Sequence, residues 1–228
     1  MAAIPIYLEV GSKRVFACAI DWPGWTRSGK TEEDAIEALT AYAPRYQPIA
    51  ASAGGTAGVG LAAVLGLTAG AGLAWPWKIE FNVVEKLRGS TTTDFGAPEM
   101  VPDADLLPST AASRRRLAAL VEATWAALDT TAAQTPPELR KGPRGGGRDR
   151  DKMIDHVLGA ETSYARKLGV KHKVPQRDDR LAVAALRQDI LAAIVDPPDE
   201  LKWPMSYAAR RIAWHVLDHA WEMEDKRT

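Results

Sequence analysis

Two histidines, His215 and His219, stand four residues apart in a stretch whose apolar spacing predicts a helix. Side chains four residues apart lie on one face of a helix, with their β-carbons about 5 to 6 Å apart, so both imidazoles can bind a single metal ion. A third histidine, His156, stands in a separate predicted helix. The chain contains only four histidines, so composition alone does not explain the close pair. We therefore predict a metal site at His156, His215 and His219.

Three imidazole ligands leave one position of a tetrahedral ion open for water or substrate, which is typical of catalytic sites and not of closed structural ones. We expect a divalent ion, zinc or nickel first, although imidazole also accepts iron and copper. The alternative is a set of polar residues at a helix rim with no metal. His172 is left out of the site because it lies between two lysines after Gly169, which is typical of a solvated loop. Asp155 and Asp218 could each orient an imidazole, and Glu161 and Glu222 are possible polar groups of the site, but all four are more often solvated surface residues.

The second half of the chain predicts four helices, each with one apolar stripe. Their expected ranges are 109–134, 149–168, 178–195 and 206–225, separated by Pro136-Pro137, Gly169 and Pro197-Pro198. Four amphipathic helices of this length can share one core as an antiparallel four-helix bundle, and converging side chains inside a bundle build metal sites. The stretch 142–150, rich in glycine and arginine, joins the first two helices and is expected to be mobile.

The first half of the chain has the residue pattern of a small sheet with one helix. Two β-rich runs, 4–10 and 15–20, flank a turn signal and predict a hairpin. Thr31 with Asp34 forms a variant capping box, so a helix is expected from Glu32 to about Tyr42, where Pro44 would stop it. A further strand is expected over residues 78–87.

Residues 94–108 carry three prolines among acidic residues and predict an extended connection between two domains. We place the first domain at residues 1–105 and the second at 106–228. Two domains also fit a length of 228 residues, at about 150 residues per domain. The expected fold class is α+β, with a small αβ sheet domain followed by a four-helix bundle.

Charge and cysteine content limit the function classes. The formal net charge is zero, and the halves before and after the Asp105 boundary carry about −4 and +4, which argues against a nucleic-acid partner. Cys18 is the sole cysteine and the first residues lack the pattern of a signal peptide, so we expect a cytoplasmic protein. We find no pattern of a Ser/His/Asp triad, a phosphate-binding glycine loop or a CxxC zinc site.

The Ala/Gly-rich segment 50–74 contains no charged residue. It is long enough to span a bilayer, which needs about 20 residues. Its frequent glycines and few large apolar residues argue against insertion. A membrane-tethered protein therefore remains a third interpretation, beside a loosely packed surface insertion.

Residues 106–227 resemble the DinB-like family of four-helix metalloproteins. The resemblance is carried by Asp-His-Val-Leu-Gly-Ala-Glu at 155–161 and Trp-His-Val-Leu-Asp-His-Ala-Trp-Glu at 214–222. It implies that His156 from the second helix and the pair His215 and His219 from the fourth hold a divalent metal ion. It also implies a transferase that uses a low-molecular-weight thiol, such as mycothiol or bacillithiol, so a small-molecule thiol or electrophile is the expected partner. Arg166, Arg210 and Arg211 are candidates to bind that cofactor.

Residues 4–43 resemble the HicB-like family, a small partial ferredoxin-like sheet with one helix. The resemblance is carried by the hairpin through residues 15–20, by Asp-Trp-Pro-Gly-Trp at 21–25 and by Ser-Gly-Lys-Thr-Glu-Glu-Asp-Ala at 28–35. It implies a regulatory or protein-interaction module, and the alternative function is such a module with the helices as scaffold. We expect Trp22 or Trp25 to contact the four-helix bundle or a second copy of the chain.

Overall fold

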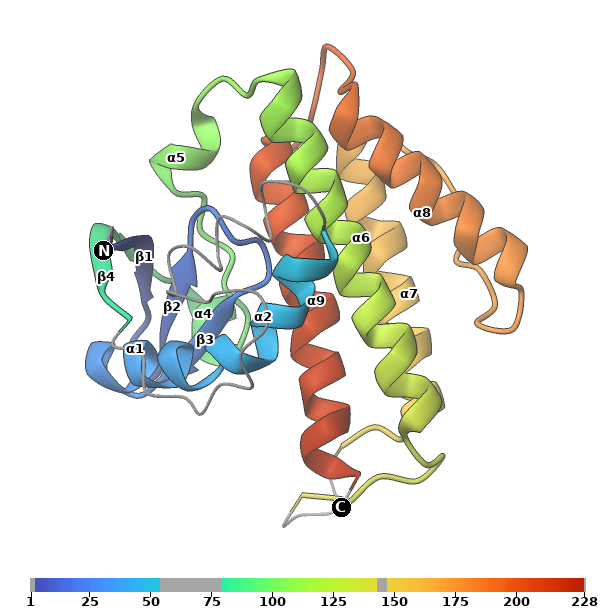
Figure 1. The fold of residues 1–228 in the computed structure, drawn as a ribbon, viewed down its shortest axis with the longest axis horizontal. Coiled ribbons are helices and arrows are strands. Elements are labelled where there is room, and N and C mark those ends of the chain that lie inside the picture. The colour runs from blue at the N-terminus through green and yellow to red at the C-terminus, as the bar shows by residue number, and fades with distance from the viewer. Residues whose placement is uncertain (1–2, 54–78, 143–146, 228) are drawn as a thin grey trace. The chain divides into compact units, whose positions relative to one another are not determined.

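The computed structural model describes residues 3–53, 79–142 and 147–227. The chain divides into two compact units, Met1–Leu107 and Pro108–Thr228, close to the boundary expected after Asp105. Unit 1 contains a four-stranded sheet, and unit 2 is helical (Figure 1). The expected α+β class is therefore confirmed at this coarse level.

The sheet of unit 1 has the order β3-β2-β1-β4. Strands β1 (Ile4–Val10) and β2 (Val15–Ala19) form the predicted antiparallel hairpin, with Val10 opposite Val15. The predicted later strand is present as β4 (Phe81–Arg88) and pairs with β1 in parallel. Strand β3 (Thr26–Gly29), which the sequence analysis did not predict, extends the sheet beyond β2.

Helix α1 (Glu32–Ala41) begins as predicted, because Thr31 and Asp34 form a reciprocal capping box. Helix α1 also ends where predicted, with Tyr42 as its C-cap, but helical structure does not stop at Pro44. A second helix, α2 (Ala43–Ser52), follows directly, and Pro44 lies in its first turn, where the missing N–H of proline is tolerated. The first residues of the Ala/Gly-rich segment thus belong to a helix.

Trp22 and Trp25 are core residues of unit 1 and not exposed anchors. Trp25 is fully buried, stacks on Tyr46 with 5.5 Å between ring centroids, and donates its indole N–H to the carbonyl of Leu39 at 2.9 Å. Trp22 meets Tyr46 edge-on and is also buried. The loop that they occupy therefore holds α1 and α2 against the sheet.

The expected extended connection at 94–108 is in part helical. It contains the end of α4 (Thr91–Phe95) and the whole of α5 (Asp103–Leu106). The fully buried carboxylate of Glu9 accepts hydrogen bonds from the Thr93 hydroxyl and from the backbone N–H groups of Glu99 and Met100. These three donors take the place of the water that the buried carboxylate loses on folding. Their hydrogen bonds hold the connecting segment against β1.

Unit 2 contains four long helices that share one apolar core (Figure 1). They agree with the predicted ranges to within a few residues: α6 (Ala111–Gln134), α7 (Arg150–Ala165) with the short 3-10 helix η1 (Arg166–Leu168), α8 (Arg180–Val195) and α9 (Met205–Lys226). Helix α9 lies against α6 and α7, and α8 lies against α6. Buried residues occur around most of α9, so it is the central helix of the core.

Two predicted features fall on residues outside those described. They are most of the Ala/Gly-rich segment 50–74 and the middle of the stretch 142–150. Among the described residues, no helix has the length and apolar character needed to cross a bilayer.

Candidate metal centre

The three predicted ligands lie together inside unit 2. His156 comes from α7, and His215 and His219 come from successive turns of α9. One nitrogen of each ring lies within 4.8 Å of one nitrogen of each of the others. The ring centroids are 5.0, 5.0 and 4.7 Å apart. His215 and His219 are 7% and 8% exposed, so the cluster faces the interior and not the solvated rim that the alternative interpretation requires.

The spacing of the nitrogens fits a shared ion. The Nε2 atoms of His156 and His215 are 3.2 Å apart. Two nitrogens bound to one tetrahedral zinc at about 2.0 to 2.1 Å from it are themselves about 3.3 Å apart. A cluster of three imidazoles with no carboxylate is also a donor set that zinc, nickel and other borderline divalent ions accept. The residues present therefore fit such an ion.

Burial keeps two of these rings neutral. Desolvation lowers the pKa of His156 to about 4, with His219 as the next cause, and it lowers the pKa of His215 to about 2, with His219 and His156 next. A neutral imidazole retains a lone pair on one nitrogen, which is the form that binds metal. No proton therefore needs to be displaced from either lone pair near neutral pH.

His219 is oriented from behind by a carboxylate. Its Nδ1 lies 2.9 Å from Oε2 of Glu222, one turn later on α9, and Lys226 donates to the other oxygen of Glu222. The hydrogen bond from His219 is the main reason that the pKa of Glu222 is lowered to about 2, and Lys226 contributes further. An Nδ1–H bonded to a carboxylate leaves Nε2 free to bind an ion, as in many carboxylate–histidine–metal arrangements.

The other acids near the histidines have different partners. Asp155 pairs with Arg177 at 2.9 Å on the surface, as expected of a solvated acid. Glu161 differs from that expectation, because it is 1% exposed and accepts a hydrogen bond from the Trp125 indole. Burial raises the pKa of Glu161 to about 7. His172 lies outside the cluster and contacts Asp189 at 2.8 Å.

Aromatic rings surround His215. Tyr164, two helical turns after His156, meets the His215 ring edge-on at 5.8 Å between centroids, and Trp214 does so at 5.9 Å. Tyr164 was not among the predicted site residues, although its spacing of eight residues from His156 places both on one face of α7. The Nδ1 of His215 is buried with no hydrogen-bond partner among the described residues. This ring is therefore held by packing and by its place in the cluster, not by a carboxylate.

The three predicted cofactor-binding arginines occupy different surroundings. The guanidinium of Arg211 lies over the rings of Trp214 and Tyr164, at 4.7 and 5.7 Å from their centroids, and it is among the charges that lower the pKa of His215. Arg210 is buried, at 5% exposure. Arg166 is exposed and its Nη2 lies 3.4 Å from the carbonyl of His172. Arg211 is therefore in electrostatic contact with the cluster.

Comparisons of this chain with models of protein families, with curated proteins and with solved structures found no match. The case for a function therefore depends on the site itself.

Proposed function

We propose that unit 2 binds one divalent metal ion, zinc or nickel, through His156, His215 and His219, as a DinB-like protein. The observation that carries this proposal is the meeting of three imidazoles from two helices, two of them buried and His156 partly exposed, with 3.2 Å between the Nε2 atoms of His156 and His215. Buried polar groups are costly unless they have partners. A shared ion would give these nitrogens a common partner and would repay the burial of three imidazoles at one point.

We further propose that the bound ion serves a low-molecular-weight-thiol S-transferase. With three protein ligands, the ion would keep one position open, and there it would lower the pKa of a thiol so that a nucleophile is present near neutral pH. In the overall reaction, sulfur forms a bond to an electrophilic carbon, the leaving group departs with the bonding electrons, and the thiol proton passes to solvent.

The residues of the chain have separate roles in this proposal. Glu222 holds the Nδ1 of His219 and so fixes the direction of its Nε2. Tyr164 and Trp214 cover His215 and limit the access of water. Arg211, whose guanidinium lies over both of these rings, is the candidate to receive the polar part of the thiol. Arg166 and Arg210 are the other two candidates that the resemblance implies.

Metal analysis tests the first part of the proposal. The purified chain, equilibrated with zinc and desalted, is expected to retain about one ion per chain by elemental analysis. His215→Ala is expected to retain far less. His172→Ala is the matched control, since His172 lies outside the cluster, and it should retain the same amount as the unchanged chain. If all three proteins retain the same amount of zinc, the proposed metal site is refuted.

A thiol-transfer assay tests the second part. The chain is incubated with mycothiol or bacillithiol and the electrophile 1-chloro-2,4-dinitrobenzene, and thioether formation is followed with and without a chelator. We expect activity that the chelator removes and zinc restores. If the chain binds zinc at the three histidines but accelerates no transfer with either thiol, the metal-site proposal stands and the transferase proposal is refuted.

For unit 1 we propose a HicB-like interaction module. The paired hairpin, the buried Trp22–Trp25 loop and the capped helix α1 support this proposal. If the protein is a regulator of this kind with unit 2 as scaffold, it should bind a protein partner equally well after removal of zinc. A partner whose binding depends on zinc would contradict that alternative.

A further inference from the structure

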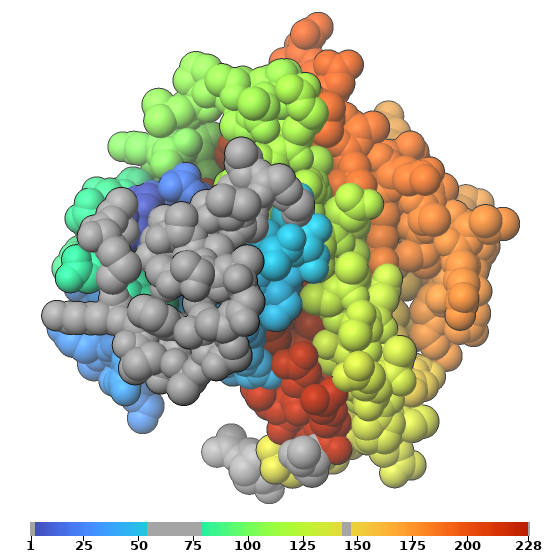
Figure 2. All heavy atoms as spheres, in the orientation of Figure 1, coloured from blue at the N-terminus to red at the C-terminus, as the bar shows by residue number. Residues whose placement is uncertain are grey.

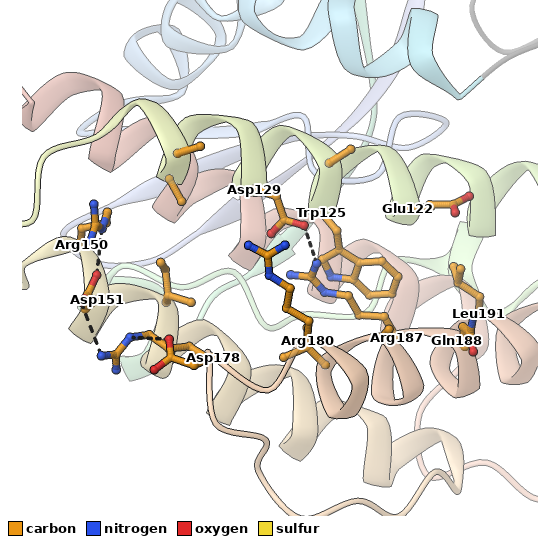
Figure 3. A pocket seen from close by; sticks show the side chains of 17 residues that line it. Glu122, Trp125, Asp129, Arg150, Asp151, Asp178, Arg180, Arg187, Gln188 and Leu191 are labelled. Carbon is orange, nitrogen blue, oxygen red and sulfur yellow. Dashed lines mark hydrogen bonds and ion pairs between the residues drawn. The ribbon is translucent and has the colours of Figure 1, made fainter.

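Unit 2 contains a groove on a different side of α7 from the histidine cluster. It has a volume of about 1120 Å³ and is lined by residues of α6, α7 and α8 and of the turn before α8 (Figure 3). Its lining residues on α7 include Arg150, Asp151 and Ile154. Ile154 and His156 are two residues apart, which places them on nearly opposite faces of a helix. None of the three histidines lines the groove.

The groove is open because small side chains line much of it. The outer faces of α6 and α8 lie next to each other in Figure 2. Helix α6 contributes Ala126, Ala132 and Ala133, and α8 contributes Val183 and Ala184. Ala126 and Ala133 lie two turns apart on one face of α6, with Ala132 next to Ala133, and Val183 and Ala184 are consecutive on α8. These short side chains leave space between the helices and give part of the groove an apolar lining, beside its arginines and acids.

Two side chains in the wall are fixed before any ligand arrives. The guanidinium of Arg187 lies 5.2 Å from the ring centroid of Trp125 and its Nη1 lies 2.9 Å from Oδ2 of Asp129. Behind this wall, the buried Glu161 accepts the indole N–H of Trp125. The Nε of Arg187 and the Oε2 of Glu161 lie 3.8 Å apart, and neither atom has a hydrogen-bond partner among the described residues. Arg187 is thus held in place while part of its donor capacity is unused.

One cation in the groove is unpaired. Arg180 stands two turns before Arg187 on the same face of α8, and its guanidinium forms no ion pair or side-chain hydrogen bond with any described residue (Figure 3). Three acids of the lining pair with other arginines: Asp129 with Arg187, Asp151 with Arg150 and Asp178 with Arg177.

We propose that this groove is a second binding site, for a small organic carboxylate with an apolar or aromatic body. Guanidinium groups match carboxylates in geometry and bind them with charge-assisted hydrogen bonds. Arg180 receives the carboxylate, with Arg187 beside it, and the body lies against the alanines and Val183. The volume of the groove, about 1120 Å³, exceeds the roughly 300 to 1,000 Å³ that small-molecule pockets usually have, so a molecule of this kind fits in part of it. The site shares no lining residue with the three histidines.

The test is a titration of the full chain with indole-3-acetate, followed by NMR at the indole N–H of Trp125, assigned by Trp125→Phe. Indole-3-acetamide, of the same shape without the charge, is the matched ligand. We expect a saturable shift with the carboxylate, binding of the amide weaker by about tenfold, and the same affinities after treatment with a chelator. A tenfold loss corresponds to about 1.4 kcal/mol, as for one charge-assisted hydrogen bond at a partly exposed site.

Two variants test whether Arg180 is the residue that binds the carboxylate. Arg180→Gln is expected to weaken the carboxylate about tenfold and to leave the amide unchanged. Arg115→Gln, which removes an exposed arginine of α6 outside the groove, should change neither. Both positions are exposed, so both variants should fold. Equal binding of the two ligands, an unshifted Trp125 resonance, or equal weakening by the two variants would overturn the proposal.

Discussion

Glu161 should make the folding stability of unit 2 depend on pH. Burial raises its pKa from 4.5 to about 7, while Arg187 and the Trp125 hydrogen bond act in the opposite direction and Asp129 raises it further. The folded state therefore binds the proton more tightly than the unfolded state does. The contribution of protonated Glu161 to the free energy of unfolding is fully present below pH 4.5 and is lost as the pH rises through about 7. At about 1.36 kcal/mol per pKa unit, the loss is about 3 kcal/mol.

Glu161→Gln isolates this contribution. The glutamine keeps an acceptor for Trp125 and cannot ionise. His156 and His215 also have shifted pKa values, and because theirs are lowered, their stability is lost as the pH falls below 6.5. These histidines act equally in both proteins, so the difference between the two unfolding free energies reports Glu161 alone.

The assay is urea unfolding in the presence of a chelator, followed at the Trp125 indole resonance, between pH 4 and pH 8.5. We expect the variant to gain about 3 kcal/mol relative to the unchanged chain across this range, most of it between pH 4.5 and 7. If the difference in unfolding free energy between the two proteins does not change with pH, the inference that burial raises the pKa of Glu161 is refuted.

Three further predictions concern other buried contacts. Glu222→Gln should weaken zinc binding about 10- to 100-fold in a competition titration, because His219 loses its charged acceptor, whereas Glu224→Gln on the same helix should not. Glu9→Ala leaves the backbone N–H groups of Glu99 and Met100 without their acceptor and should cost about 2 to 4 kcal/mol, with faster amide exchange at both residues as the local readout. Trp25→Phe removes the hydrogen bond to Leu39 and part of the stack on Tyr46, and it should lower the unfolding free energy of unit 1 by about 1 to 3 kcal/mol in denaturant titrations; an unchanged midpoint would contradict the packing described.

The elements with long periodic patterns could be predicted from sequence because their burial is periodic. Helices α6 to α9 each carry an apolar stripe, and β1 and β2 flank a clear turn signal. Strand β3 could not be predicted, since Thr-Arg-Ser-Gly has no apolar alternation and is held by pairing with β2. Helix α2 was missed because a proline was taken as a stop, although the first turn of a helix needs no N–H at that position.

The same contrast applies to the sites. Spacing within one helix predicted that His215 and His219 share a face, and one helical turn likewise relates His219 to Glu222. The burial of Glu161 and the groove depend on how α6, α7 and α8 face one another. No local pattern contains that information, because an acid on an amphipathic helix is most often solvated.

Glu161 lowers stability at neutral pH, so its presence in the core calls for a reason beyond stability. Residues five apart on a helix differ by about 140° in direction, and the rotation of α7 that places Glu161 between Trp125 and Arg187 also turns His156 toward α9. We infer that this buried contact fixes the rotation of α7, since a hydrogen-bonded acid accepts fewer arrangements than an apolar residue. Glu161→Met tests the idea: it should be more stable than the unchanged chain at pH 8 and should bind zinc less tightly. A variant that gains stability and keeps full zinc affinity would show that packing alone aligns His156 with His215.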